Sequence, residues 1–119
     1  MKKILIIEDD PILIELTLHI LQKRGFIIET LNQTDQLFDQ LKKNKPDLII
    51  LDNLLEGKIT GLELAVQIKT NPSYFSIPIL LTSGQSLDDS SLKNGPDDYL
   101  KKPFEPEVFI QKINALLEV

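Results

Sequence analysis

The chain has 119 residues, of which 42% are hydrophobic, and a formal charge of −5 at pH 7. A chain of this length is typical of one domain with one hydrophobic core, so we predict a single domain over residues 1–119. The sequence contains no cysteine and a single histidine, His19, which excludes disulfides, thiolate metal sites, thiol nucleophiles and a multi-histidine metal centre.

The acidic charge balance argues against direct nucleic-acid binding, because that function needs a cluster of basic side chains. The apolar run at residues 4–7 is too short for a secretory signal. No apolar stretch approaches the roughly 18 residues that a membrane span requires. We therefore expect a soluble, cytoplasmic protein without a membrane partner.

In chain order, short apolar runs alternate with segments of helical spacing. The apolar runs predict buried strands at residues 4–7, 26–28, 48–51, 79–81 and, more weakly, 99–100. Apolar stripes with helical spacing occupy residues 12–21, 37–41, 62–68 and 108–117. A further helix between Gly84 and Gly95 has only Leu87 and Leu92 as apolar residues, so we expect it to be short or frayed. This alternation predicts an α/β fold with a doubly wound parallel sheet and helices on both faces.

Two helix starts are encoded locally. Asp10 before Pro11 is typical of an N-cap followed by proline at the first helical position. Thr60 and Glu63 have the spacing of a capping box at the start of the third helix.

Polar residues follow four of the predicted strands directly. They are Glu8-Asp9-Asp10, Asp52, Thr82-Ser83 and Lys101-Lys102-Pro103. Because the carboxyl ends of parallel strands form the ligand crevice of such sheets, we expect these side chains to converge. Clustered carboxylates repel one another unless a pKa rises or a cation binds. Oxygen ligands favour Mg²⁺, and a nearby lysine and hydroxyl would complete a site for a phosphoryl group.

Four motifs occur in a fixed order along the chain: the acidic pair Glu8-Asp9, the run Asp-Leu-Ile-Ile-Leu-Asp ending at Asp52, Thr82, and residues 97–104 (Asp-Asp-Tyr-Leu-Lys-Lys-Pro-Phe). With these motifs the chain resembles the receiver domain of bacterial two-component response regulators, the CheY-like family. The resemblance runs from Lys3 to about Leu117. It implies a flavodoxin-like sheet of five parallel strands in the order 2-1-3-4-5.

The resemblance implies a role for each matching residue near the metal. Asp52 would be the phosphoacceptor, attacking the phosphorus of a phosphohistidine on a partner. Asp9 would bind Mg²⁺ directly and Glu8 through water, with Asp52 and the backbone carbonyl of Leu54 as further ligands. Asp10 lies one position past the acidic pair, in agreement with its interpretation as a cap.

It also implies roles for the residues around the phosphoryl group. Thr82 would donate a hydrogen bond to the phosphoryl oxygens, and Lys102 would pair with them, oriented by a cis peptide bond to Pro103. Tyr99 would be the aromatic side chain that turns inward once Thr82 moves. His19 lies within the first helix and is assigned a structural or surface role.

The implied partner is a sensor histidine kinase or a phosphotransfer protein, and the downstream effector or output domain is left open. The loop after Asp52 carries Glu56-Gly57 and departs from the commoner family form, which indicates a subtype. The segment between Thr82 and Tyr99 is about two residues shorter than in the commoner family form. Because this shorter segment belongs to the output face of the family, the sequence does not decide whether the chain forms a homodimer.

Two other functions are compatible with parts of the pattern. A Mg²⁺-dependent aspartyl phosphatase of the haloacid-dehalogenase type would need an aspartate two positions after its nucleophile, where this chain has Leu54. A receiver-like scaffold that works without phosphorylation would usually lack part of the acidic set or the lysine. We therefore expect a signalling module that catalyses only its own phosphorylation and dephosphorylation, not an enzyme acting on other substrates.

Overall fold

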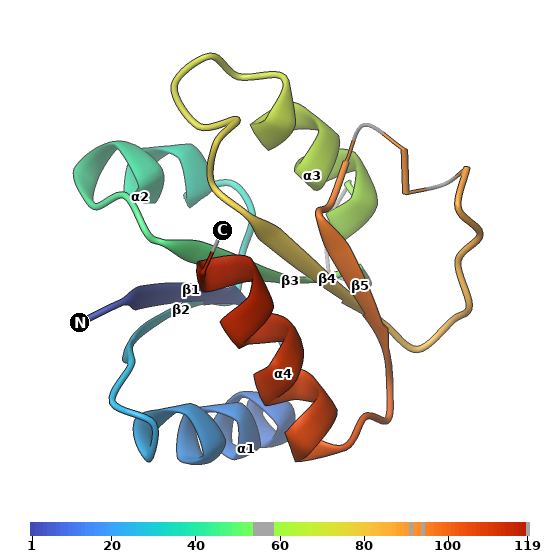
Figure 1. The fold of residues 1–119 in the computed structure, drawn as a ribbon. Helices are drawn as coiled ribbons and strands as arrows, with labels where there is room; N and C mark the ends of the chain where they lie inside the picture. Colours follow the sequence, from blue (N-terminus) through green and yellow to red (C-terminus); the bar gives the residue numbers. More distant parts are fainter. Residues whose placement is uncertain (54–58, 91, 94, 119) are drawn as a thin grey trace.

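The computed structural model describes residues 1–53, 59–90, 92–93 and 95–118. Five parallel strands form one sheet in the order β2-β1-β3-β4-β5 (Figure 1). They are β1 (Lys3–Ile7), β2 (Ile27–Leu31), β3 (Leu48–Asp52), β4 (Ile79–Ser83) and β5 (Asp98–Lys101). The described residues form four helices, α1 (Pro11–Gln22), α2 (Leu37–Lys43), α3 (Gly61–Lys69) and α4 (Pro106–Leu117). The predicted fold class and strand order are confirmed.

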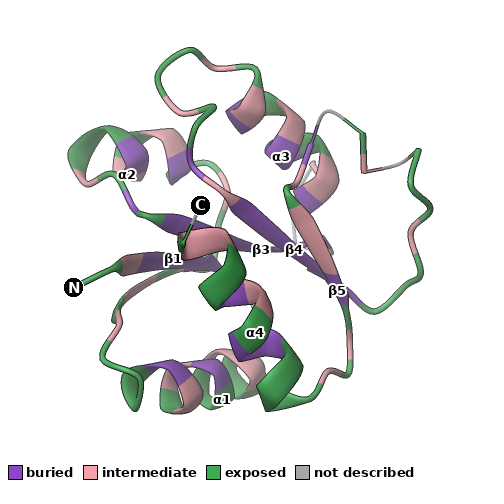
Figure 2. Ribbon diagram, in the orientation of Figure 1, coloured by how far each residue is buried: buried purple, intermediate pink, exposed green. Residues whose placement is uncertain are grey.

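The sheet separates two apolar layers. Helices α1 and α4 cover one face and α2 and α3 cover the other (Figure 1). Successive residues of a strand point to opposite faces, so Leu5 and Ile7 of β1 pack toward α2 and α3, whereas Ile4 and Ile6 pack toward α1 and α4. Strands β3 and β4 are buried along their whole length (Figure 2). Burial on both faces explains why their sequences are continuous apolar runs.

The edge strand β2 differs from the predicted one. It begins at Ile27, one residue later than expected, and continues to Leu31. Its added residues include Glu29 and Thr30, which do not fit an apolar run. Because β2 lies at the edge of the sheet, beside β1, part of the strand reaches solvent, and polar residues are tolerated there.

Both predicted helix caps are present. The Ile12 N–H donates to Asp10 Oδ1 at 3.0 Å, and Pro11 opens α1. The Glu63 N–H donates to Thr60 Oγ1 at 3.1 Å at the start of α3. These contacts satisfy backbone donors that have no partner inside the helix.

The helix expected between Gly84 and Gly95 is reduced further than we expect from the sequence. None of the described residues of this segment is helical; residues 89–90 and 92–93 lie in turns, with hydrogen bonds such as that from the Leu92 N–H to the Asp89 carbonyl at 3.3 Å. Leu87 and Leu92 are its apolar contacts with the core, and both are only partly buried. Two such contacts contribute too little to offset the cost of helix nucleation.

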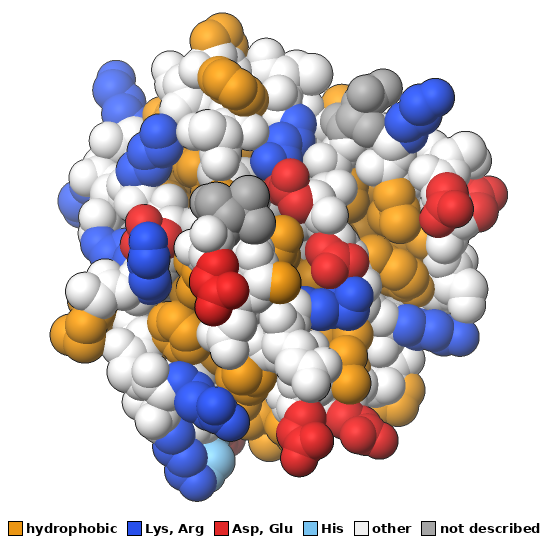
Figure 3. Space-filling view, viewed as in Figure 1, with side chains coloured by type: hydrophobic (Ala, Val, Ile, Leu, Met, Phe, Trp, Pro, Cys, Tyr) orange, Lys and Arg blue, Asp and Glu red, His pale blue; other side chains and the backbone are white. Residues whose placement is uncertain are grey.

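The surface around these layers is charged. Lys, Arg, Asp and Glu side chains are spread over the face that carries α4 and β5 (Figure 3). Among the described residues, no helix has both the length and the apolar character needed to cross a membrane.

Candidate functional site

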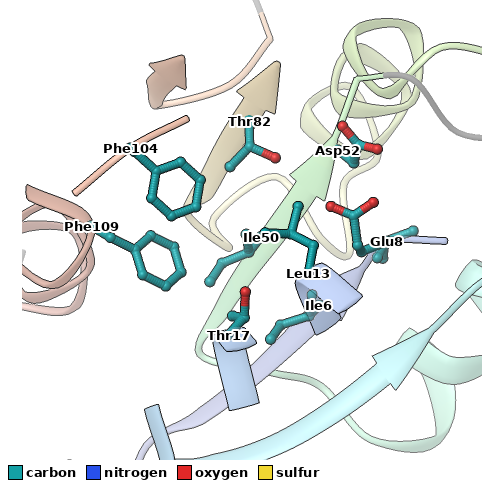
Figure 4. A pocket seen from close by; sticks show the side chains of 10 residues that line it. Ile6, Glu8, Leu13, Thr17, Ile50, Asp52, Thr82, Phe104 and Phe109 are labelled. Carbon is teal, nitrogen blue, oxygen red and sulfur yellow. The ribbon is translucent and has the colours of Figure 1, made fainter. Parts of the chain in front are cut away.

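The carboxyl ends of four strands bring the predicted polar residues together. Glu8 follows β1, Asp52 ends β3, Thr82 lies near the end of β4, and Lys102 follows β5. Figure 4 shows the Glu8, Asp52 and Thr82 side chains beside one another at this edge of the sheet. Each of the three is about 95% buried, with 5%, 5% and 4% of its surface exposed. The convergence predicted from strand topology is therefore present.

Lys102 bridges the two buried carboxylates. Its Nζ atom lies 3.0 Å from Glu8 Oε1 and 3.0 Å from Asp52 Oδ1. The Lys102 N–H donates to the Ser83 carbonyl at 2.7 Å, which attaches the segment after β5 to the end of β4. The peptide bond to Pro103 is cis, as the resemblance implies.

The pKa values of this group follow from burial and mutual contact. Burial is the largest influence on Glu8 and raises the pKa of its carboxyl; the hydrogen bond from Lys102 lowers it, and the neighbouring Asp52 raises it again. For Lys102, burial alone would lower the pKa, but hydrogen bonds to Glu8 and Asp52 outweigh it and leave the pKa raised. Lys102 therefore stays charged at neutral pH and acts as the counterion of both carboxylates.

Three carboxylates form a set that fits a divalent cation. One oxygen from each of Glu8, Asp9 and Asp52 lies within 4.8 Å of the other two. Hard cations such as Mg²⁺ and Ca²⁺ bind oxygen ligands of this type. The remaining expected ligand, the backbone carbonyl of Leu54, lies outside the described residues, as does the loop pair Glu56-Gly57.

Asp10 does not belong to this cluster. Its carboxylate accepts the Ile12 N–H as the cap of α1, and its own N–H donates to Glu8 Oε2 at 3.3 Å. The Asp9 N–H donates to the same Glu8 oxygen at 3.2 Å. The backbone at the start of α1 thus holds the Glu8 carboxylate in place.

Tyr99 lies on β5, which is separated by β4 from the strand that carries Asp52. It pairs with Leu81 in the β4–β5 register, next to the pair formed by Thr82 and Leu100. Its half-buried side chain donates its hydroxyl hydrogen to the carbonyl of Gln85, in the segment after β4. Tyr99 therefore connects β5 to the segment that follows Thr82, and its inward turn stays a prediction.

A cavity lies beneath the carboxylates, between the sheet and helices α1 and α4. Phe104 and Phe109 line it with stacked rings, 4.9 Å between centroids, and Thr17 of α1 faces it (Figure 4). His19 lies on the outer surface of α1 and is exposed, which agrees with its surface assignment.

Sequence patterning did not single out Thr17, Phe109 or Asn53 as neighbours of the site. Thr17 and Phe109 look like ordinary members of amphipathic helices. Asn53 gives one weak signal, because an amide directly follows a fully buried strand.

Comparisons with known proteins agree with this geometry. The sequence model described as the response regulator receiver domain matches residues 4–114. The alkaline phosphatase synthesis transcriptional regulatory protein PhoP of Bacillus subtilis is 31% identical over 98% of this chain and 48% of its own length. The phosphate regulon transcriptional regulatory protein PhoB of Pseudomonas aeruginosa is 32% identical over 98% of this chain and 52% of its own length. The chain thus spans about half the length of these relatives.

The fold is likewise similar to solved structures. The signal receiver domain of a signal transduction histidine kinase from Syntrophus aciditrophicus superimposes with a TM-score of 0.89 and is 31% identical in sequence. This match covers 99% of the present chain and 91% of the other chain.

Proposed function

Because the chain belongs to the response regulator receiver domain family, we propose that Asp52 accepts a phosphoryl group from the phosphohistidine of a sensor histidine kinase or phosphotransfer protein. One observation carries this proposal: a single ammonium group, that of Lys102, lies 3.0 Å from a buried aspartate and 3.0 Å from a second buried carboxylate. Such an arrangement offers both a carboxylate nucleophile and the positive charge that a phosphoryl group requires.

The transfer is an in-line substitution at phosphorus. One Asp52 carboxylate oxygen forms a bond to phosphorus while the bond between phosphorus and the imidazole nitrogen breaks, and the electron pair of that bond stays on the imidazole. Thr82 sits opposite Asp52 in the β3–β4 register and donates its hydroxyl to a phosphoryl oxygen. Lys102 exchanges its contact with Asp52 for a contact with another phosphoryl oxygen. The protein thus contributes position and charge rather than further covalent chemistry.

The carboxylates of Glu8, Asp9 and Asp52 would hold Mg²⁺, Asp9 directly and Glu8 through water. A bound Mg²⁺ supplies positive charge against the oxygens of the phosphoryl group. The donor set of three clustered carboxylates supports this assignment. The Leu54 carbonyl remains part of the proposed ligand set.

The aspartyl phosphate adds about one to two negative charges next to Thr82. We propose that Thr82 then moves, that Tyr99 turns inward, and that the changed surface is recognised by an output domain or a separate effector. The relatives are named as transcriptional regulatory proteins and are about twice as long as this chain. We propose that this domain does not itself contact DNA and that it works in the cytoplasm.

The alternative functions have less support. A haloacid-dehalogenase-type phosphatase lacks its second aspartate here, and the family match is to receiver domains. A scaffold that works without phosphorylation gives no reason for Glu8, Asp52 and Lys102 to be buried together.

The test is incubation with Mg²⁺ and acetyl phosphate, followed by intact-protein mass spectrometry. The wild type should gain one phosphoryl group and Asp52→Asn none. Asp10→Asn is the matched control, because asparagine keeps the helix cap and Asp10 lies outside the cluster, so this variant should still be labelled. A wild type that gains no phosphoryl group, or an Asp52→Asn variant that is still labelled, would contradict the proposal. Turnover of a phosphomonoester would favour the phosphatase instead.

A further inference from the structure

Asn53, the residue after Asp52, is 7% exposed and connects three segments of the chain. Its N–H donates to the Thr82 carbonyl at 2.9 Å, which attaches it to β4. Its own carbonyl accepts the Gly61 N–H at 3.0 Å, and its side-chain Oδ1 accepts the Leu62 N–H at 2.9 Å. The last two contacts attach the end of β3 to the start of α3.

These contacts cap α3 from the end of β3, eight and nine positions earlier in the sequence. The first N–H groups of any helix have no partner within it. Thr60 satisfies the N–H of Glu63 locally, whereas the N–H groups of Gly61 and Leu62 are satisfied by Asn53. The position of α3 relative to β3 therefore depends on Asn53.

The start of α3 also lies directly against the backbone of Asp52. A Cβ atom added to Gly61 would lie 2.2 Å from the carbonyl oxygen of Asp52 and 2.8 Å from Asn53 Cα. Only glycine allows the helix start to lie against this backbone. The peptide that carries Asp52 is thus held by β4 on one side and by α3 on the other.

We propose that Asn53 is a positioning residue for phosphoryl transfer: its side-chain amide holds the start of α3 against β3 and so keeps the Asp52 carboxylate in the geometry in which Lys102 reaches it. This inference rests on the proposed function. An in-line transfer is sensitive to the placement of the nucleophile. A displacement of α3 acts directly on the peptide next to Asp52, so the effect of Asn53 is not confined to stability.

The test compares Asn53→Leu, Asn53→Asp and the control Asn71→Leu with the wild type. The rate of phosphorylation with acetyl phosphate is measured at saturating Mg²⁺, at a temperature where circular dichroism shows each variant to be folded. Asn53→Leu loses the acceptor at similar size and should be slower by about tenfold or more. Asn53→Asp keeps an acceptor at the same place, and a negative charge there is favourable at a helix N-terminus, so its rate should lie closer to that of the wild type. If Asn53→Leu does not fold, Asn53→Ser replaces it, because the shorter side chain cannot reach the Leu62 N–H.

Asn71→Leu is the matched control. Asn71 Oδ1 also accepts a backbone N–H, that of Ser73 at 2.8 Å, but in the turn beyond the carboxyl end of α3. This variant should lose stability and keep the wild-type rate. A second readout is amide hydrogen exchange of Leu62, which should become faster in Asn53→Leu and stay unchanged in Asn71→Leu.

Three outcomes would overturn the inference: a wild-type rate in Asn53→Leu, an equal slowing in Asn71→Leu, or an Asn53→Asp variant as slow as Asn53→Leu. In each of these the wild type is phosphorylated, so the proposed function survives. A wild type that gains no phosphate would overturn both.

Discussion

Replacing Lys102 by methionine should destabilise the protein far more than replacing Lys112. Both lysines contact carboxylates at similar distances: Lys102 Nζ lies 3.0 Å from Glu8 and from Asp52, and Lys112 Nζ lies 3.1 Å from both oxygens of Asp98. The carboxylates differ in burial. The side chains of Glu8 and Asp52 are 6% exposed, and that of Asp98 is 37% exposed. Methionine keeps an apolar side chain of similar length, so each substitution removes mainly the charge.

The magnitude follows from this difference in burial. At an effective dielectric constant of about 20, two unit charges 3.0 Å apart attract by about 5 kcal/mol. Dehydration cancels part of this attraction, and removing one partner of a buried ion pair costs about 3–5 kcal/mol because the other charge is left unpaired. An exposed pair contributes about 0–1 kcal/mol. We therefore expect Lys102→Met to lose about 3–5 kcal/mol of unfolding free energy at pH 7 without Mg²⁺, and Lys112→Met about 1 kcal/mol or less.

The loss should also depend on pH. The hydrogen bond from Lys102 lowers the pKa of Glu8, so without Lys102 that pKa rises further and Glu8 takes up a proton more readily. A protonated Glu8 no longer repels Asp52, and the deficit of Lys102→Met should shrink between pH 7 and pH 5. Urea unfolding followed by circular dichroism at both pH values measures it. Equal losses in the two lysine variants at pH 7, or a Lys102→Met loss that does not change with pH, would refute this explanation.

Three further predictions follow from the same geometry. Burial raises the pKa of Glu8 above its ordinary value of 4.5, so above about pH 4.5 the folded state still holds a proton that the unfolded state has released, and the unfolding free energy should fall as the pH rises. Glu8→Gln should flatten this slope in urea titrations, and an unchanged slope would contradict the assignment. Asp9→Asn should weaken Mg²⁺ binding about tenfold or more, measured by calorimetry, because one of three clustered charges is lost; an unchanged affinity would remove Asp9 from the ligand set. Gly61→Ala should lower the free energy of unfolding by about 1–3 kcal/mol, because its methyl group meets the Asp52 carbonyl. Gly84→Ala places its methyl group in open space and should change that free energy by no more than about 0.5 kcal/mol. Equal unfolding midpoints for the two variants would show that α3 moves aside freely.

Much of the site follows from strand topology. Strands β3 and β4 are recognisable because burial on both faces demands unbroken apolar runs. Once these strands are taken as parallel, their carboxyl ends must meet, and the residues after them, Asp52 and Thr82 among them, must converge. The bridging of Glu8 and Asp52 by Lys102 does not follow in this way. It depends on where a flexible side chain is placed by the segment after β5.

Two features escape sequence reasoning for different physical reasons. Among the described residues between Gly84 and Gly95, turns take the place of the expected helix, because the balance between helix and turn is small when only Leu87 and Leu92 there pack against the core. Asn53 escapes because its partners lie at the start of α3, and the residue that its side chain contacts is nine positions away. A single amide creates no periodic pattern, so its role becomes visible only when the helix and strand are placed together.

The charge balance of the site explains how two buried carboxylates are tolerated while negative charge is left over for a cation. When ionised, Glu8, Asp9 and Asp52 carry three negative charges against the single positive charge of Lys102. Lys102 compensates for the burial of Glu8 and Asp52, and the remaining negative charge still favours a divalent cation. Under the proposed function, Lys102 needs only to exchange a carboxylate oxygen for a phosphoryl oxygen. A counterion that is already held in place needs little reorganisation during the transfer, which is the condition under which fixed charges accelerate a reaction most.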